Sequence, residues 1–143
     1  MKTVGIVGAG ADKFTPAGEA RARALIREII QRYGFDCVVS GRSPLGGIDE
    51  WAIDEARKLG KVTVEYPSKT NQWEGPGGYK ERNLKIAQAS DEVWSIVVDA
   101  LPSWYNGRKF PLCYHCGRKD HVKSGGCWTA RKAKIGHVTI VKN

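Results

Sequence analysis

The chain has 143 residues, of which 41% are hydrophobic and 27% charged, an ordinary globular balance. A chain of this length buries a hydrophobic core without needing metals or disulfides, so we expect residues 1–143 to form one domain. No apolar run is long enough to span a bilayer, and glycine interrupts the first apolar residues too soon for a signal peptide. These features predict a cytoplasmic protein with no membrane partner, in which clustered cysteines more often bind metal than pair.

The formal net charge of +8 fits either simple solubility or an anionic partner. That partner would be a phosphorylated small molecule or a nucleic acid. The basic residues concentrate late in the chain, where Asp120 is the only acid between residues 108 and 134. This asymmetry favours a polyanion near that part of the chain.

The N-terminal part of the chain predicts a strand, a turn and a helix. Residues 3–7 form a short apolar strand, which leads into the glycine-rich turn 8–12. Thr15 is placed to cap a helix with Pro16 in its first turn, and Gly34 ends it. The apolar stripe of this helix has helical spacing and consists of Leu25, Ile26, Ile29, Ile30 and Tyr33.

Strands and helices alternate along the rest of the chain. We expect further strands over 35–39, 61–66, 91–98 and 137–141, and further helices ending at Gly60 and spanning 79–89 and 128–134. Alternation of this kind produces a parallel sheet with helices on both faces. The predicted fold class is therefore α/β, a three-layer Rossmann-like sandwich with about five parallel strands and a small zinc-binding insertion.

The predicted insertion holds most of the metal-ligand residues of the chain. Two thiolates separated by two residues can face one tetrahedral ion, and an imidazole with a third thiolate completes the shell. Soft sulfur ligands with one nitrogen favour zinc over magnesium or calcium, and four protein ligands leave no open position. We therefore expect a structural zinc ion in an inserted segment over residues 99–127, bound by Cys113, Cys116, His121 and Cys127.

The spacing of this segment resembles a zinc knuckle with one extra residue before the last cysteine. His115 is a second candidate nitrogen ligand. We expect its ring to point away from the ion because of its neighbours on both sides in the Cys-x-x-Cys turn. The alternative is that these cysteines are unrelated loop residues. Cys37 stands alone in a strand and is expected in the core.

Glycine-rich turns precede the expected ligand edge of the sheet, since parallel α/β sheets bind ligands beyond the carboxyl ends of their strands. Gly8-Ala9-Gly10 looks like the start of a dinucleotide fingerprint, although Lys13 occupies the place of the third glycine. It would let a phosphate approach a helix start, or it is only a tight turn. In the second turn, over 40–49, backbone amides can cradle a phosphate, while the acids at the start of the next helix, Asp49 and Glu50, can take ribose hydroxyls.

Three stretches of the chain together resemble the SLOG superfamily. The first joins Val-Val-Ser-Gly at 38–41 to Gly-Gly-Ile-Asp at 46–49, the second is the Gly-x-x-Glu-Arg-Asn run at 78–83, and the third is Ser-Gly-Gly-Cys-Trp-Thr at 124–129. Members of this superfamily include LOG-type nucleotide hydrolases, often described as possible lysine decarboxylases, and the Rossmann domain of the DNA-processing protein A. The resemblance covers about residues 3–98 and 124–141, and it implies binding of a nucleotide or nucleotide-derived ligand.

The resemblance does not extend to the hydrolase loop of the LOG enzymes. Pro76-Gly77-Gly78 echoes the start of their Pro-Gly-Gly-x-Gly-Thr-x-x-Glu loop, but the Gly-Thr pair is missing and the acid comes too early. The resemblance therefore implies binding more than catalysis. Whether the chain is an enzyme is left open; if it is one, we expect an N-glycoside hydrolase acting on a nucleoside monophosphate.

Together these patterns define a set of candidate residues. Glu81 or Asp49 would be the general base of a hydrolase, although acids at helix starts are also favoured by the helix dipole. Trp73 and Trp104 would stack on a base, or they are loop anchors. Arg82 would contact a phosphate in a bidentate manner. The expected ligand-binding residues are Gly8, Gly10, Ser40, Gly41, Gly46, Gly47, Asp49, Arg82, Asn83, Gly126 and Thr129.

Three functions compete at this point. The first is binding, sensing or processing of a nucleotide-like ligand, and the second is phosphoribohydrolase activity. The third is binding of single-stranded nucleic acid by the basic zinc segment, through Tyr114, Arg118, Lys119 and Lys123. By analogy with the superfamily, we expect a homodimer.

Overall fold

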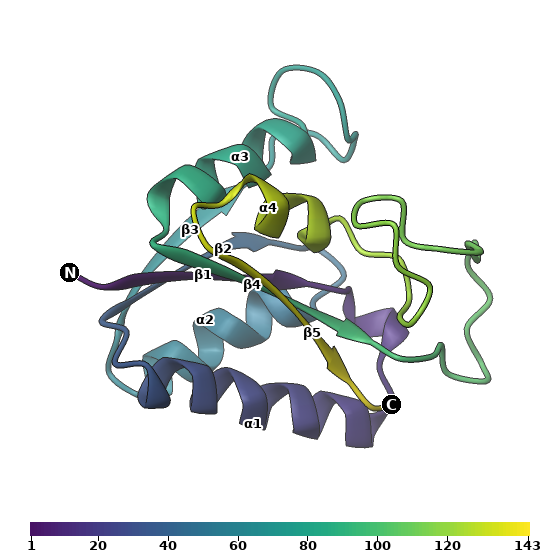
Figure 1. Cartoon of the computed structure of the whole chain (residues 1–143), viewed down its shortest axis with the longest axis horizontal. Helices are drawn as coiled ribbons and strands as arrows, with labels where there is room; N and C mark the ends of the chain where they lie inside the picture. The colour runs from purple at the N-terminus through teal and green to yellow at the C-terminus, as the bar shows by residue number, and fades with distance from the viewer.

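The computed structural model describes all 143 residues and contains a five-stranded parallel sheet of order β3-β2-β1-β4-β5 (Figure 1). The strands are β1 (Thr3–Gly8), β2 (Cys37–Arg42), β3 (Val62–Pro67), β4 (Glu92–Val98) and β5 (Gly136–Val141). The helices are η1 (Ala11–Lys13, a 3-10 turn), α1 (Pro16–Arg32), α2 (Ile48–Lys58), α3 (Tyr79–Ala89) and α4 (Gly126–Lys132). The predicted Rossmann-like α/β class is confirmed.

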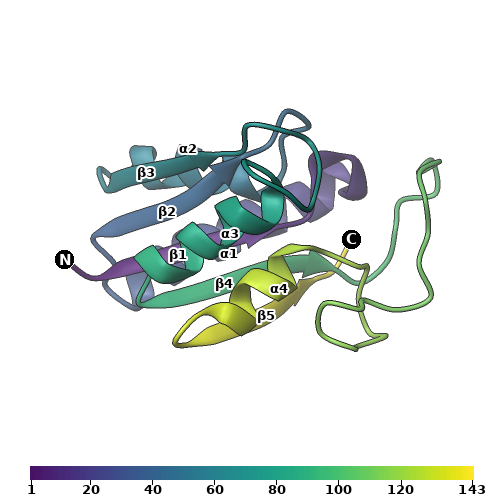
Figure 2. The ribbon, with the colours of Figure 1, turned by 90° about the horizontal axis from the view of Figure 1, so that it is seen from above.

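Helices cover both faces of the sheet, with α1 and α2 on one side and α3 and α4 on the other (Figures 1 and 2). Successive side chains of a strand point to opposite faces, so β1 supplies Val4 and Ile6 to the larger apolar cluster and Val7 to the smaller one. Cys37 belongs to the smaller cluster and is buried, as expected. No helix combines the length and apolar character that a membrane span requires.

Most predicted boundaries agree closely with the structure, and the main exceptions are β2 and α4, which spans Gly126–Lys132 rather than 128–134. Thr15 caps α1 by accepting a hydrogen bond from the Gly18 amide at 2.9 Å, and α3 has the predicted limits. Strand β2 begins at Cys37, two residues late, because Phe35 is fully buried beneath the end of α1 and its amide donates to the Ile30 carbonyl.

A buried acid holds α1 against α2. Glu55 of α2 is fully buried and accepts hydrogen bonds from Arg23 of α1 at 2.9 Å, from Lys58 at 3.1 Å and from Arg27. Burial raises the pKa of the Glu55 carboxyl, but the hydrogen bonds from Arg27, Lys58 and Arg23 outweigh burial and hold that pKa below its ordinary value. This cluster ties together the two helices that cover one face of the sheet.

Replacing Glu55 with Gln tests this helix contact. We expect Glu55→Gln to lower the free energy of unfolding by about 2 kcal/mol at pH 7, because hydrogen bonds to a charged group are lost. The folded pKa is depressed, so the wild-type advantage is present above the unfolded pKa and disappears as the pH falls through the folded pKa. Urea unfolding of both proteins at several pH values measures this difference in stability.

Glu28→Gln is the matched control, because Glu28 forms only an exposed pair with Arg32 at 3.5 Å. That substitution should change stability by less than about 0.5 kcal/mol. Equal effects of the two substitutions would mean that Glu55 does not stabilise the contact between the helices.

Candidate functional site

A tight turn brings the first two cysteine sulfurs together. The Cys116 and Gly117 amides both donate to the Cys113 carbonyl, at 3.3 and 2.6 Å, and the Cys113 amide donates to the Arg118 carbonyl at 2.9 Å. Gly117 has φ +76°, a conformation that favours glycine. The turn therefore places the sulfurs of Cys113 and Cys116 on the same side of the backbone.

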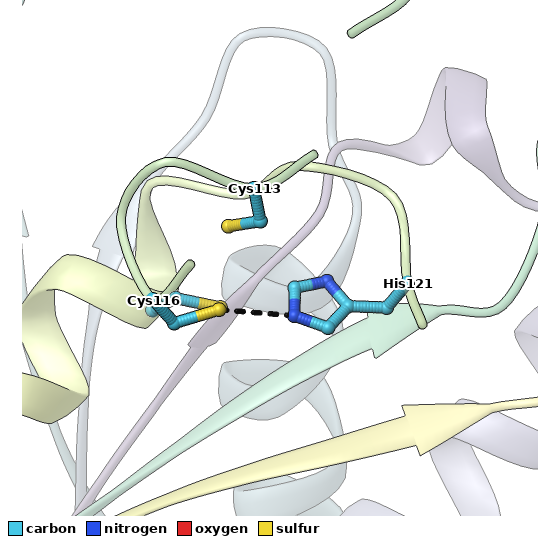
Figure 3. Close-up of side chains that lie close together, drawn as sticks. Cys113, Cys116 and His121 are labelled. Atoms are coloured by element: carbon cyan, nitrogen blue, oxygen red, sulfur yellow. Dashed lines mark hydrogen bonds between the residues drawn. The ribbon is translucent and has the colours of Figure 1, made fainter. Parts of the chain in front are cut away.

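His121 and Cys127 complete the cluster from other parts of the chain. Cys127 lies in the first turn of α4, and one ligand-type atom from each of the four residues lies within 4.8 Å of the others. His121 Nε2 is 3.2 Å from Cys116 Sγ (Figure 3). With its proton on Nδ1, His121 donates to the Val122 carbonyl at 2.8 Å, which leaves Nε2 free to bind a metal ion. The predicted metal-ligand set is confirmed as a cluster that can hold an ion, and His115 lies outside it.

The cluster attaches the connection 99–125 to the sheet. Cys127 Sγ is 3.5 Å from the Ser95 hydroxyl of β4, and Cys113 and Cys127 pack with Val97 of the same strand. The connection contains no helix or strand apart from the isolated bridge between Cys113 and Arg118. Burial raises the pKa of the Cys127 thiol, so its thiolate needs a nearby cation.

A cavity of about 530 Å³ opens beyond the carboxyl end of β1, between the starts of α2, α3 and α4 and the Cys/His turn. This volume is within the range of small-molecule sites. Its lining consists of Val7, Gly8, Ser43, Gly46, Asp49, Trp73, Tyr79, Arg82, Asn83, Tyr114, His115, Lys123, Gly125 and Gly126. The predicted ligand edge of the sheet is therefore hollow.

Asp49 is the buried acid of this cavity. It is 8% exposed, and its Oδ1 has no hydrogen-bond partner in the protein. Burial raises the pKa of the Asp49 carboxyl to about 6, although the Arg82 cation and the Gly8 amide oppose the shift. A carboxyl group that is buried, half unpaired and lines a cavity is suited to accept a hydrogen bond from a ligand.

Arg82 connects α3 to the ends of two strands. Its Nε donates to Asn83 Oδ1 at 2.7 Å, and its Nη1 donates to the Arg42 and Tyr66 carbonyls at 3.3 and 3.2 Å. A Cβ at Gly41 would lie 2.2 Å from Nη1, which explains the glycine there. Nη2 lies 4.0 Å from Asp49 Oδ2 and is the only guanidinium nitrogen without a hydrogen bond. Arg82 therefore has one nitrogen available to a ligand, whereas the predicted bidentate phosphate contact uses N–H groups on two nitrogens.

Aromatic side chains form the walls of the cavity. Trp73 lies 5.1 Å from the His115 ring and 5.4 Å from the Trp128 ring, measured between centroids. Tyr114 and His115, the two residues between the first cysteine ligands, both line the cavity. Sequence reasoning missed them as walls of a small-molecule site. The available signal was that both residues inside the Cys-x-x-Cys turn carry rings.

The remaining predicted ligand residues differ in position. Gly8, Gly46, Asp49, Arg82, Asn83 and Gly126 line the cavity, whereas Gly10 lines a neighbouring one. Ser40 is buried and donates to the Ile6 carbonyl at 2.5 Å. Thr129 is fully buried with an unpaired hydroxyl. The lining of the cavity does not include Ser40, Gly41, Gly47 or Thr129.

Two other expected residues also lie outside the cavity. Glu81 is exposed, and its carboxylate accepts a hydrogen bond from the Gly77 amide at 3.1 Å, so it supports the loop before α3. Trp104 is 61% exposed and does not line the cavity. Of the two candidate bases, Asp49 is the one that faces the cavity.

The start of α1 is closed, which corrects the expectation that a phosphate reaches it from the Gly8-Ala9-Gly10 turn. The 3-10 turn η1 separates that turn from α1. The Thr15 amide donates to Asn143 Oδ1 at 2.7 Å, and a Cβ at Gly18 would lie 2.2 Å from the same oxygen. The C-terminal residue therefore covers the first turn of the helix.

Comparisons with known proteins give little that bears on the site. No protein-family model and no curated protein matches the chain. Among solved structures, the Moco carrier protein of Chlamydomonas rheinhardtii is similar at 19% identity and a TM-score of 0.46, over 66% of this chain and 60% of that one. The chain thus spans about 60% of the length of that carrier. So remote a likeness says nothing about what this chain binds, and the SLOG resemblance stays a prediction.

The buried acid predicts a stabilising substitution. We expect Asp49→Asn to raise the free energy of unfolding at pH 7.5 by up to about 3 kcal/mol, since each unit of pKa shift corresponds to about 1.4 kcal/mol. The folded pKa of Asp49 is raised to about 6, so wild type gains stability relative to the variant as the pH falls through 6. The difference should vanish below the unfolded pKa of about 4.

Chemical denaturation of both proteins between pH 4 and pH 8 measures this effect. Asp54→Asn is the control, because Asp54 is about half exposed and lies 3.7 Å from Arg23. It should leave stability within about 0.5 kcal/mol of wild type at every pH. An Asp49 variant less stable than wild type at pH 7.5 would contradict the assignment of a burial penalty.

Proposed function

We propose that the chain binds a nucleotide or a nucleotide-derived phosphorylated ligand in the 530 Å³ cavity, with a structural zinc ion holding one wall. The observation that carries this proposal is the free Oδ1 of buried Asp49. An unpaired buried polar group costs about 1–3 kcal/mol. A ligand N–H or O–H group removes that cost when it binds.

The aromatic lining of the cavity favours a planar heterocycle. Rings of Trp73, Tyr79, Tyr114 and His115 line it, and aromatic faces stack well on bases. A base N–H or a ribose hydroxyl would donate to Asp49, and Lys123 offers a positive charge for a phosphate at another part of the lining. A nucleotide contains all three matching groups: a planar base, a hydrogen-bond donor and a phosphate.

Zinc is the ion that the donor set fits best. Three thiolates and one imidazole are soft ligands that favour zinc over magnesium or calcium. With four protein ligands, the ion has no open coordination position, and its contribution would be structural. Because Tyr114 and His115 lie between Cys113 and Cys116, an ion bound there would fix the part of the cavity wall that they form.

Asp49 also supports a second candidate, hydrolysis of an N-glycosidic bond. Its pKa of about 6 suits a general base near neutral pH. In this role Asp49 would accept a proton from the water that attacks the ribose carbon, and it would do so from within the cavity, where Glu81 does not reach. Release of ribose 5-phosphate from nucleoside monophosphates distinguishes this reaction from binding alone.

Nucleotide binding is tested with Asp49→Asn. We expect wild type to bind at least one of AMP, GMP, CMP and UMP in calorimetry. The variant should bind that nucleotide at least tenfold more weakly, because an amide cannot replace both acceptor oxygens of the carboxylate. Since the variant is expected to be the more stable protein, misfolding would not explain the loss. Asp54→Asn should bind as wild type does, and failure of all four nucleotides to bind, both as monophosphates and as diphosphates, would refute the proposal.

Zinc binding is tested by elemental analysis of protein purified without added metal. We expect about one equivalent of zinc per chain. Cys116→Ser should lose it, while Cys37→Ser, which changes a cysteine outside the cluster, should retain it. A stable metal-free wild-type protein would contradict the zinc proposal.

The same samples test the link between metal and cavity. Removing zinc with a chelator should weaken nucleotide binding, because the ligand would then have to order Tyr114 and His115 itself. Coupling of this kind is reciprocal, so saturating nucleotide should slow zinc loss. An unchanged nucleotide affinity, combined with loss of single-strand binding, would instead mark the zinc segment as an independent nucleic-acid module.

A further inference from the structure

A second cavity of about 470 Å³ adjoins the first. The two cavities share Gly8, Lys123 and Gly125 in their linings. The second one lies between the Gly8-Ala9-Gly10 turn and the connection 99–125, and its lining does not include Asp49. The two cavities therefore meet at Gly8, Lys123 and Gly125.

The two cavities differ in how strongly positive they are. The first is lined by the buried Asp49 carboxylate and two cations, Arg82 and Lys123, while the second is lined by five basic residues and one acid. That acid, Asp99, already accepts a hydrogen bond from the Asn143 amide at 2.8 Å. The basic residues of the second cavity are Lys13, Arg108, Lys109, Lys119 and Lys123.

Four of these five cations lack an acidic partner within the protein. The exception is Lys13, which forms an ion pair with exposed Asp12 at 3.5 Å. The Arg108 guanidinium and the Lys123 ammonium group each lie 4.8 Å from the centroid of the Phe110 ring, so one ring holds two like charges close together. Like charges concentrated around a concave surface repel one another and attract an anion.

We propose that the second cavity binds the phosphate groups beyond the first, and that the ligand is therefore a nucleoside diphosphate or triphosphate. The base lies between the aromatic walls near Asp49, and the phosphate chain passes Gly8 toward Arg108 and Lys109. The inference rests on the proposed nucleotide function, and it names the class of nucleotide. A monophosphate bound in the first cavity would leave most of the basic residues without an anion.

Comparing one nucleoside as its mono-, di- and triphosphate tests the inference. We expect calorimetry of wild type to show at least tenfold tighter binding of the diphosphate than of the monophosphate. Arg108→Gln combined with Lys109→Gln should weaken diphosphate binding about tenfold and leave monophosphate binding within twofold. Both residues are exposed, so the double variant should fold. Inorganic pyrophosphate should compete with the diphosphate.

The matched control is Lys132→Gln combined with Lys134→Gln, which removes two positive charges outside both cavities. This control should bind both nucleotides as wild type does. Equal affinity for mono- and diphosphate would overturn the inference while leaving the nucleotide function intact, and absence of any nucleotide binding would overturn both. If a single-stranded oligonucleotide binds wild type more tightly than every nucleotide does, and the Arg108/Lys109 double variant fails to bind it, the basic cavity would be reassigned to nucleic acid.

Discussion

The candidate site depends on one buried charge, the Asp49 carboxylate at the carboxyl edge of the sheet. Its neighbours fit closely around it: a Cβ at Gly41 would lie 2.9 Å from Asp49 Oδ2, and Arg82 comes from α3 to face the same oxygen. Arg82 in turn bonds the carbonyls at the ends of β2 and β3, so the pair links α2, α3 and two strands. The other carboxylate oxygen, Oδ1, stays unpaired, which is why we propose that a ligand donor binds there.

The Cys/His cluster solves a different problem, which is how to hold a long connection without regular secondary structure. Its ligands come from the turn at Cys113, from His121 and from the first turn of α4. Gly126, just before Cys127, packs so closely that an added Cβ would lie 3.1 Å from Gly8 Cα. The cluster is therefore adjacent to both the aromatic wall of the first cavity and the turn between the two cavities. An ion that orders the cluster would also fix the shape of both cavities.

The sequence predicts those parts of the molecule that follow from local patterns. Alternating apolar segments predicted the parallel sheet, Thr15 and Gly34 bounded α1, and cysteine spacing predicted the ligand cluster, because each depends on residues near one another in the chain. The closing of α1 by Asn143 was not predictable, since that contact joins opposite ends of the sequence. The roles of Tyr114 and His115 were missed for a related reason: spacing predicts which side chains face the metal, but not which cavity the others line.

The distribution of charge in the cleft would give the proposed nucleotide one orientation. A phosphate near Asp49 would meet a carboxylate that is largely ionised above pH 6, in surroundings that screen little. A base near Arg108 and Lys109 would leave these cations without an anionic partner. Both penalties disappear when the base lies beside Asp49 and the phosphates lie beyond Gly8. In the proposed complex the buried Asp49 carboxylate is thus the feature that would distinguish the two ends of the ligand, and the closely packed turn at Gly8 and Gly126 lies between the two environments.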